Sequence, residues 1–336
     1  MSTPAGQATI YDVATRAGVS ISTVSHTLNR PQRVHAVTRQ RVLDAIDELG
    51  YVPKATAVAH ARKAVGRIGV IAPFSSYASY TRRLKGILQE AGADATEIVI
   101  YDHESAASAT SPLLSALPIT RRLDGVVIMG VPLDDQLADR LFAQGLPTVL
   151  VDSHRPELDS IDIDDHTAGY LAGTHLVERG RRSFAYVSEA QRSDAYVSQG
   201  QLRRNGFRRA VAQHGVQLDR VRHVHTSRDI AGGRAAVAQM IDNGGLPEAI
   251  FAHQDVLAAG IVLECRRRGV RVPDDVAVMG FDDGELAEAL DLTTVRQPLE
   301  ESGRLGFRHL REALNGRQGA ARHVTLAVQL VARGTT

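Results

Sequence analysis

The sequence has no tryptophan, a single cysteine and few aromatic residues of any kind. Only 4% of its 336 residues are aromatic, and Cys265 is the lone thiol. One cysteine excludes a disulfide framework and a zinc site built from several thiolates, and it suits a reducing cytosol. No apolar run approaches the ~20 residues of a membrane helix, which excludes a membrane protein. Residues 1–8 lack the basic start and apolar core of a secretory signal, so we expect a cytoplasmic protein.

The signatures of common enzyme classes are also missing. The chain has no phosphate-binding glycine loop, no Gly-x-Ser-x-Gly turn and no His-Glu-x-x-His run. We therefore expect no catalytic residue, no metal and no cofactor. Two clusters keep an alternative open, because the acidic run 162–166 could hold a metal or transfer protons, and His223 and His225 could be ligands. That alternative is a metal- or carboxylate-dependent enzyme on a two-lobed α/β fold.

Charge is spread unevenly along the chain. The net charge of the whole protein is only +1. Residues 1–63 contain eight Lys or Arg and four acids, which makes this segment +4 and leaves −3 for the rest. A basic segment of this kind is where nucleic acid phosphates would bind.

Local signals predict a pair of short helices within this basic segment. Thr9 is a good N-cap, and Asp12 follows it at the spacing of a capping-box variant. Gly18 supplies the end of the first helix. Ser20 then starts a second helix that ends near Asn29.

A third helix is predicted to start at Thr38 and to end at Gly50. Val37 and Val42 have the spacing of a hydrophobic staple around that start. Two helices joined by a glycine-containing turn, with a third behind them, are typical of a helix-turn-helix. The second helix exposes short polar groups and His26, which suit base edges in a major groove. The alternative is a small helical bundle in which serine and threonine only cap helices and face water.

Two stretches of this segment resemble a known family. Residues 10–29 (IYDVATRAGVSISTVSHTLN) and 38–53 (TRQRVLDAIDELGYVP) closely resemble the DNA-binding headpiece of the lactose-repressor/galactose-repressor (LacI/GalR) family of bacterial regulators. The resemblance implies a ligand-responsive transcriptional repressor that binds a near-palindromic double-stranded DNA operator as a homodimer. The regions 80–91 and 132–142 are expected to be buried in that dimer. A transport binding protein would share the sensor fold, but the headpiece and the missing secretory signal exclude it.

The resemblance also implies which side chains contact DNA. Ile21, Ser22 and His26 would face bases, where Ile21 can touch a thymine methyl and His26 can donate to a purine. Phosphate contacts would fix the position of the helix on the duplex. Thr23, Ser25 and Arg30 are predicted to make such phosphate contacts. The remaining predicted DNA contacts are Thr9, Asn29, Lys54, Ala57 and His60.

Residues 51–61 (YVPKATAVAHA) resemble the hinge helix of the family. Family members usually carry Asn where Lys54 stands and Leu where His60 stands. That Leu is the wedge that enters the minor groove and kinks the DNA. Because imidazole is a poorer apolar wedge, our hypothesis is that this protein bends its operator less or bends it with another residue. A hinge shifted by one turn is the alternative.

After residue 63 the chain alternates apolar runs with amphipathic stretches. This order predicts parallel sheets covered by helices on both faces. Eight strands could form one large sheet, a barrel or two lobes. The predicted strands are 67–72, 96–101, 125–129, 148–152, 183–188, 221–225, 249–252 and 276–280. The predicted helices are 80–91, 134–143, 168–179, 200–214, 231–243, 255–268 and 300–315.

The family resemblance extends over this region through the runs 67–73 (RIGVIAP), 124–130 (DGVVIMG), 280–283 (GFDD) and 292–298 (LTTVRQP). It implies an α/β, two-lobed, periplasmic-binding-protein-like sensor that binds a small-molecule effector, such as a sugar, in its cleft. The predicted parts are a headpiece at 1–50, a hinge at 51–65 and a sensor at 66–336, with lobe 1 at 66–164 and 298–323 and lobe 2 at 165–297 and 324–336.

Matched residue by residue, the family places effector contacts at Asp152, Arg203 and Asp255, with Phe281 as a packing surface. A guanidinium and a carboxylate can divide the hydroxyls of a polyol between donors and acceptors. The alternative is that Asp255 caps a helix and Arg203 is a solvated surface residue. For Asp165, helix capping is favoured.

The first-lobe loop departs from the family pattern. Where the family has an acidic residue and an Asn-Pro-Phe-Phe-like run, residues 74–80 read FSSYASY. Without tryptophan, stacking on a ligand falls to the aromatic residues of this loop or to Tyr196. We therefore include Phe74, Ser75 and Tyr80 among the predicted effector contacts.

Overall fold

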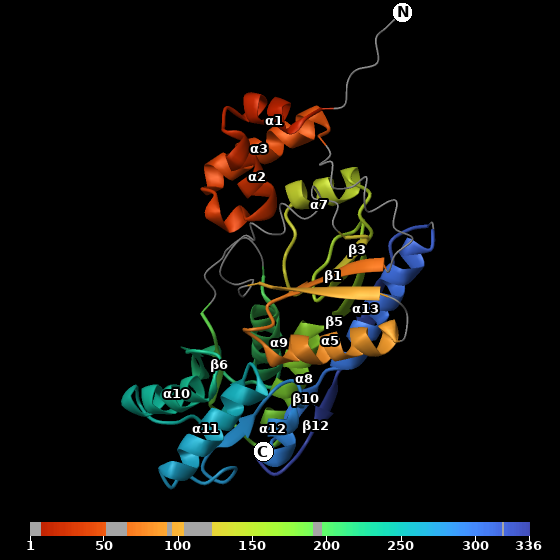
Figure 1. Cartoon of the computed structure of the whole chain (residues 1–336). Helices are drawn as coiled ribbons and strands as arrows, with labels where there is room; N and C mark the ends of the chain where they lie inside the picture. Colours follow the sequence, from red (N-terminus) through yellow and green to blue (C-terminus); the bar gives the residue numbers. More distant parts are fainter. Residues whose placement is uncertain (1–7, 52–65, 93–95, 104–122, 191–196, 318) are drawn as a thin grey trace, which may run out of the picture.

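The computed structural model describes residues 8–51, 66–92, 96–103, 123–190, 197–317 and 319–336. A small helical headpiece is followed by two α/β lobes (Figure 1). The predicted α/β class, with parallel sheets flanked by helices, is confirmed. Within these described ranges, no helix combines the length and the apolar character that a bilayer crossing requires.

Local side chains set the helix ends of the headpiece. Thr9 and Asp12 form a reciprocal capping box at the start of α1, as predicted. Gly18 ends that helix at φ 64°, a left-handed conformation that glycine adopts without strain. The hydroxyl of Ser20 accepts from the Thr23 N–H and starts α2. The elements are α1 (Ile10–Ala17), α2 (Ile21–Asn29), the 3-10 turn η1 (Pro31–Arg33) and α3 (Ala36–Leu49).

The third helix starts earlier than the sequence pattern indicates. It begins at Ala36, so the predicted cap residue Thr38 lies inside its first turn. The N-cap residue is His35, which makes no side-chain capping bond. Instead, Arg39 donates from its guanidinium to two carbonyls of the preceding turn. The prediction of the helix start was wrong because this contact depends on the folded path of the turn.

Lobe 1 is a six-stranded parallel sheet with the order β11-β5-β4-β3-β1-β2. Alternate residues of each strand face opposite layers, so Val127 packs towards α5 and α13 while Ile128 packs towards α7. The elements are β1 (Gly66–Ala72), α5 (Ala78–Ala91), β2 (Thr96–Asp102), β3 (Gly125–Met129), α7 (Asp135–Ala143), β4 (Thr148–Val151), β5 (Asp159–Ile163), α13 (Leu299–Leu314) and β11 (His323–Leu326).

Lobe 2 is a four-stranded parallel sheet with the order β7-β6-β8-β9. Helices α8 and α9 cover one face and α10 and α11 the other. Phe207 of α9 is fully buried against this sheet, and such a side chain contributes about 1.5–3 kcal/mol. The elements are α8 (Asp165–Glu178), β6 (Phe184–Ser188), α9 (Gln199–Gln213), η2 (Leu218–Arg220), β7 (Val221–His225), α10 (Ile230–Asp242), β8 (Ala249–Ala252), α11 (Asp255–Arg267), β9 (Ala277–Met279) and α12 (Glu285–Ala289).

The chain passes between the lobes three times. It leaves lobe 1 after β5 at Asp164, returns at Pro298 before α13, and passes again after Leu326 at the end of β11. A two-stranded antiparallel ribbon of β10 (Thr294–Arg296) and β12 (Gln329–Val331) lies beside α8 of lobe 2. The lobes are therefore joined by three neighbouring segments.

Some short elements are absent from the sequence prediction. Strand β5 carries Asp159 and Asp162 among its five residues, which weakens its apolar signal. Strands β10, β11 and β12 are three or four residues long, and α12 has five residues. Periodicity needs longer segments than these.

The headpiece contacts lobe 1 at α7. Arg140 of α7 is buried, and its guanidinium lies 2.9 Å from the Asp47 carboxylate and 3.3 Å from that of Asp44. Both acids belong to α3. The side chains of α2 that we predict to contact bases take no part in these ion pairs.

Candidate functional site

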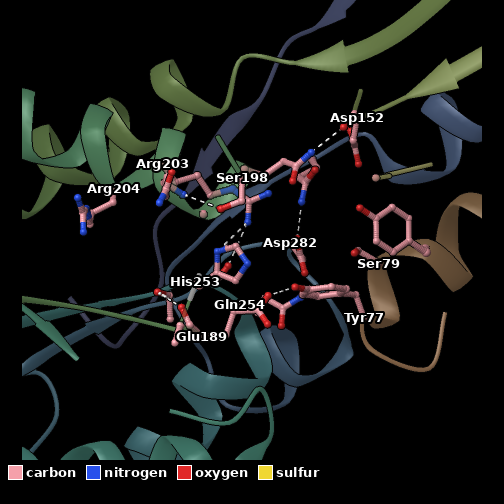
Figure 2. A pocket seen from close by; sticks show the side chains of 18 of the residues that line it. Tyr77, Ser79, Asp152, Glu189, Ser198, Arg203, Arg204, His253, Gln254 and Asp282 are labelled. Atoms are coloured by element: carbon pink, nitrogen blue, oxygen red, sulfur yellow. Dashed lines mark hydrogen bonds between the residues drawn. The ribbon is translucent and has the colours of Figure 1, made fainter. Parts of the chain in front are cut away.

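A polar cavity of about 270 Å³ lies between the two lobes. Several of its lining residues directly follow parallel strands, as Asp152 does after β4 and Glu189 after β6. Open α/β sheets bind ligands at these strand ends. The lining includes Tyr77, Ser79, Tyr80, Arg83 and Asp152 from lobe 1, and Glu189, Arg203, Arg204, His223, His225, His253, Gln254 and Asp282 from lobe 2 (Figure 2).

On the lobe 1 wall, Arg83 and Asp152 form a buried ion pair. Their closest nitrogen and oxygen atoms are 2.5 Å apart. Arg83 also donates to the Gln297 side chain over 3.1 Å. Its buried Nε has no hydrogen-bond partner among the described residues. A buried unpaired donor costs free energy, which a ligand or water oxygen would recover.

On the lobe 2 wall, Arg203 is held by three groups. Its Nε donates to Asp165 over 2.6 Å, and its Nη1 donates to the His253 carbonyl over 3.2 Å. Its guanidinium carbon lies 3.6 Å from the centre of the Phe281 ring. Burial raises the pKa of Asp165 to about 6, although the Arg203 charge opposes that rise. Burial and the nearby Arg203 charge hold the pKa of His253 well below its usual value, so this imidazole is neutral.

Asp282 supplies a carboxylate to the same cavity. Burial raises its pKa, while the charges of Arg203 and Arg83 act in the opposite direction. Gln297 donates to one of its oxygens. Its φ of 110° is rare for a residue with a side chain, and strained backbone of this kind clusters at ligand sites. The two arginines and Asp282 thus offer donors and an acceptor to hydroxyl groups.

Side chains from both lobes meet at the cavity. The Tyr77 hydroxyl of lobe 1 donates to the Glu189 carboxylate of lobe 2. Arg228 lies 2.8 Å from Glu189, donates to Ser76 over 3.2 Å, and stands 4.8 Å from the centre of the Tyr77 ring. Gln199 of lobe 2 donates to the backbone carbonyl that follows β4 in lobe 1. We use the word closed for this arrangement, in which hydrogen bonds join the two lobes across the cavity.

Three of the seven predicted effector contacts, Tyr80, Asp152 and Arg203, line the cavity. Asp255 is not among the lining residues. Its carboxylate accepts from the Gly284 N–H and from the Thr294 hydroxyl, each over 2.7 Å, and burial raises its pKa to about 8.

The other three predicted contacts lie around the cavity wall. Phe281 is fully buried beneath the guanidinium of Arg203. Phe74 packs against the core of lobe 1. Ser75 is exposed, and its N–H donates to Asp102 over 3.0 Å. In this arrangement, these residues support or flank the cavity wall.

The structure corrects the alternative roles of three charged residues. Arg203 is buried and not a solvated surface residue. Asp164 caps α8 by accepting from the Thr167 N–H over 2.9 Å, whereas Asp165 pairs with Arg203. Asp255 is the first residue of α11, but its carboxylate accepts from Gly284 and from Thr294 of β10 and does not cap the helix. Asp164 and Asp165 carry the same capping signal in the sequence, so only the structure shows which one caps α8 and which one pairs with Arg203.

The sequence prediction omitted Arg83, Glu189 and Asp282. Asp282 stands in the matched GFDD run and could have been carried over together with Phe281. Arg83 lies on the amphipathic helix α5, where arginine is ordinarily solvated. No local signal marks it as buried.

The predicted base contacts lie on the outer face of α2. Ile21 is 40% exposed, and Ser22 and His26 are also exposed. Val24 and Leu28 point into the headpiece core. This division leaves short polar groups, one imidazole and one apolar side chain facing outwards, as a helix in a major groove requires.

The remaining predicted DNA contacts have mixed positions. Thr23 and Ser25 are half-buried, whereas Arg30 is exposed after the end of α2. Thr9 donates from its hydroxyl to Asp12 over 2.6 Å within the capping box. Asn29 is the last residue of α2. Lys54, Ala57 and His60 lie outside the described residues, together with nearly all of the predicted hinge.

Comparison with known proteins assigns the family. Residues 9–54 match the bacterial regulatory proteins of the lacI family, and residues 174–336 match the periplasmic binding protein-like domain. The HTH-type transcriptional regulator DegA of Bacillus subtilis (strain 168) is 32% identical over 335 residues, which cover 98% of each chain. The chain belongs to the LacI family. The repressor CytR of Escherichia coli (strain K12) is 29% identical over 98% of this chain and 96% of its own.

Solved structures of LacI-type proteins share the architecture of this LacI-family chain. The regulator CelR in complex with cellobiose is 26% identical with a TM-score of 0.71, over 98% of this chain and 100% of its own. The Lac repressor dimer bound to operator and the anti-inducer ONPF is 26% identical with a TM-score of 0.68, over 98% and 99% of the two chains.

This LacI-family chain is a transcriptional regulator and not an enzyme, because its relatives are regulators. The acidic run 162–166 serves instead as the cap of α8 and as the partner of Arg203. His223 accepts a hydrogen bond from Arg204. In the part of the chain that the structure describes, no three metal-binding side chains are grouped to hold an ion.

Proposed function

We propose that this LacI-family regulator represses transcription as a homodimer on a near-palindromic operator, under the control of a sugar or sugar derivative bound in the cleft. The cavity between the lobes carries the proposal. Arg83 and Asp152 come from one lobe, and Arg203 and Asp282 from the other. A polyol that contacts both walls binds the closed arrangement better than an open one, and so shifts the balance between them.

The DNA part of the proposal rests on α2 and on charge. Each α2 would enter a major groove with Ile21, Ser22 and His26 facing bases, one headpiece for each half-site. Thr23, Ser25 and Arg30 would contact phosphates. The charge of +4 on residues 1–63 supports this role. Binding would therefore weaken as salt rises, because bound counterions are released from the DNA.

Linkage would connect the two sites. If the ligand favours one arrangement of the lobes and DNA favours another, each reduces the affinity for the other by the same factor. A ligand that favours the DNA-bound arrangement would instead act as a corepressor. The protein would work in the cytoplasm, where the operator is.

The dimer would use lobe 1 helices. Leu88 of α5 is 50% exposed and Phe142 of α7 is 45% exposed, so each offers a large apolar side chain to an interface. Both lie in the regions that the sequence indicated for the interface. Burial of these side chains between two copies would support the paired headpieces that a palindromic site needs.

Gel retardation tests the proposal. The full chain is mixed with DNA from upstream of its own gene, with and without each member of a sugar panel, and scrambled DNA of equal length is the control. We expect a sequence-specific complex with the mass of a dimer on one site, and a change in its amount with at least one sugar. Equal binding to scrambled DNA would contradict the DNA part, and a complex insensitive to the whole panel would contradict sugar control.

A further inference from the structure

Three arginines line the cavity, and they differ in how their charge is balanced. Arg83 pairs with Asp152 and Arg203 with Asp165, each at ion-pair distance. Arg204 has no carboxylate partner among the described residues, and its Nε is buried without a hydrogen bond there. The positive charge of Arg204 is therefore uncompensated in the described part of the cleft.

A neutral imidazole holds the Arg204 guanidinium in place. Its Nη1 donates to Nδ1 of His223 over 2.8 Å, and Nε2 of the same ring lies 2.8 Å from the Ser188 hydroxyl. Because Nδ1 accepts, the proton of the neutral ring is on Nε2, which donates to Ser188. Burial, together with the nearby His225, Arg204 and Arg208, lowers the pKa of His223 to about 4. The imidazole therefore orients the guanidinium without adding or cancelling charge at neutral pH.

The described groups around Arg204 supply no carboxylate that pairs with it. His225 also lines the cavity, with its ring centre 3.9 Å from that of His223. The Glu189 carboxylate is engaged by Tyr77 and Arg228. Figure 2 shows Arg204 and Asp152 on opposite sides of the cavity, so Arg204 is separated from Asp152, the acid of lobe 1 that lines it.

We propose that the effector carries an anionic group, a carboxylate or a phosphate, which binds Arg204 beside His225. The inference rests on the proposed function and narrows its ligand to acidic sugars: uronates, aldonates or sugar phosphates. A guanidinium presents parallel N–H donors that match both kinds of anion. The hydroxyls of the same molecule would then reach Asp282 and Arg203 along the cavity.

Calorimetric titration of the full chain tests the proposal with matched compounds. The panel pairs galactose with galacturonate and galactose 6-phosphate, and glucose with gluconate, glucuronate and glucose 6-phosphate. The variants are Arg204→Gln, Arg204→Lys and, as the matched control, Arg209→Gln, which removes an exposed arginine of the same helix. We expect at least one acid to bind about tenfold or more tightly than its neutral partner to the wild type and the control. Arg204→Gln should abolish that preference, and Arg204→Lys should keep part of it.

A second measurement uses simple anions and needs no knowledge of the sugar. Inorganic phosphate and acetate are titrated separately while the imidazole C–H resonances of His223 and His225 are followed by NMR. We expect either anion to shift these resonances in the wild type and in Arg209→Gln but not in Arg204→Gln. The proposal would be overturned if neither anion shifted these resonances and the wild type bound acidic and neutral sugars equally well. Acids that bind through Arg204 without changing operator affinity would support the anion site and contradict the proposed control of DNA binding.

Discussion

The hydroxyl of Tyr77 in lobe 1 donates a hydrogen bond to the carboxylate of Glu189 in lobe 2. Arg228 binds the same carboxylate and lies against the Tyr77 ring, so one tyrosine links the lobes through two contacts. The contacts of Tyr77 with Glu189 and Arg228 hold the two walls of the cavity together. They should therefore contribute to the preference of a ligand for the closed arrangement.

Tyr77→Phe should weaken effector binding. The variant keeps the ring against Arg228 but loses the hydrogen bond to a charged group, which contributes about 1.5–3 kcal/mol. Because Tyr77 is half-buried, we take the lower end of this free-energy range, which corresponds to about a tenfold rise in the effector Kd. Calorimetry with the ligand selected by gel retardation measures it, with Tyr170→Phe on α8 as the control. An unchanged Kd for Tyr77→Phe would show that the hydrogen bond does not favour the ligand-bound arrangement.

Asp255→Asn should reduce the pH dependence of stability. Burial raises the pKa of Asp255 from 3.8 to about 8 in the folded chain. Between these values the folded state holds a proton that the unfolded state releases, so the free energy of unfolding falls as pH rises from about 4 to 8. The Asn variant should lose up to about 1.4 kcal/mol per pH unit of that slope. Urea unfolding at several pH values measures it. Exposed Asp242 gives the control Asp242→Asn, and equal slopes for both variants would contradict the prediction.

Thr9→Ala should destabilise the headpiece. The Thr9 hydroxyl accepts from the Asp12 N–H, and the Asp12 carboxylate accepts from both the N–H and the hydroxyl of Thr9. Loss of such a cap costs about 0.5–2 kcal/mol. Hydrogen exchange of α1 amides reports local stability, and Thr9→Ser should retain the cap. If both variants exchange like the wild type but bind operator weakly, Thr9 acts on DNA and not through the cap.

His26→Ala should relax the operator preference at one position. The exposed imidazole of α2 is predicted to contact a base, and loss of such a contact costs about 1–3 kcal/mol. Selection from randomised half-sites, followed by affinity measurement, should show one position becoming permissive. Uniform weakening across all sequences would instead place His26 at a phosphate.

His60→Leu should increase operator bending if this hinge position enters the minor groove, because leucine is a better apolar wedge than the imidazole of this chain. Circular-permutation gel analysis or energy transfer across the operator measures the bend angle. An unchanged angle would mean that another hinge residue enters the minor groove.

Helices of this chain were predictable where their signals are local. The capping box of Thr9 and the stop at Gly18 operate within a few residues, so α1 and α2 appear where the sequence places them. Strand β5 pairs with the nearby β4 on one side and, on the other, with β11, which lies more than 150 residues away. A strand with two aspartates gives no apolar signal that would reveal this partner.

The cleft was predictable only in part for a related reason. Asp152 and Arg203 follow from the match to the family, and both line the cavity. The matched Asp255 supports a loop through Gly284 instead. Arg204 was not predicted, because its interest lies in having no carboxylate partner among the described residues. A sequence pattern cannot show whether an arginine has such a partner.

The three passages between the lobes also affect the order in which the protein is made. Lobe 1 obtains its edge strand β11 and its covering helix α13 from the last fifth of the chain. On the ribosome, the apolar face beneath α13 and the free edge of β5 stay uncovered while the part of lobe 2 between Asp165 and Gln297 is synthesised. Lobe 2 can thus pack most of its layers before lobe 1 is complete, and slow translation should favour chaperone binding to the unfinished lobe 1.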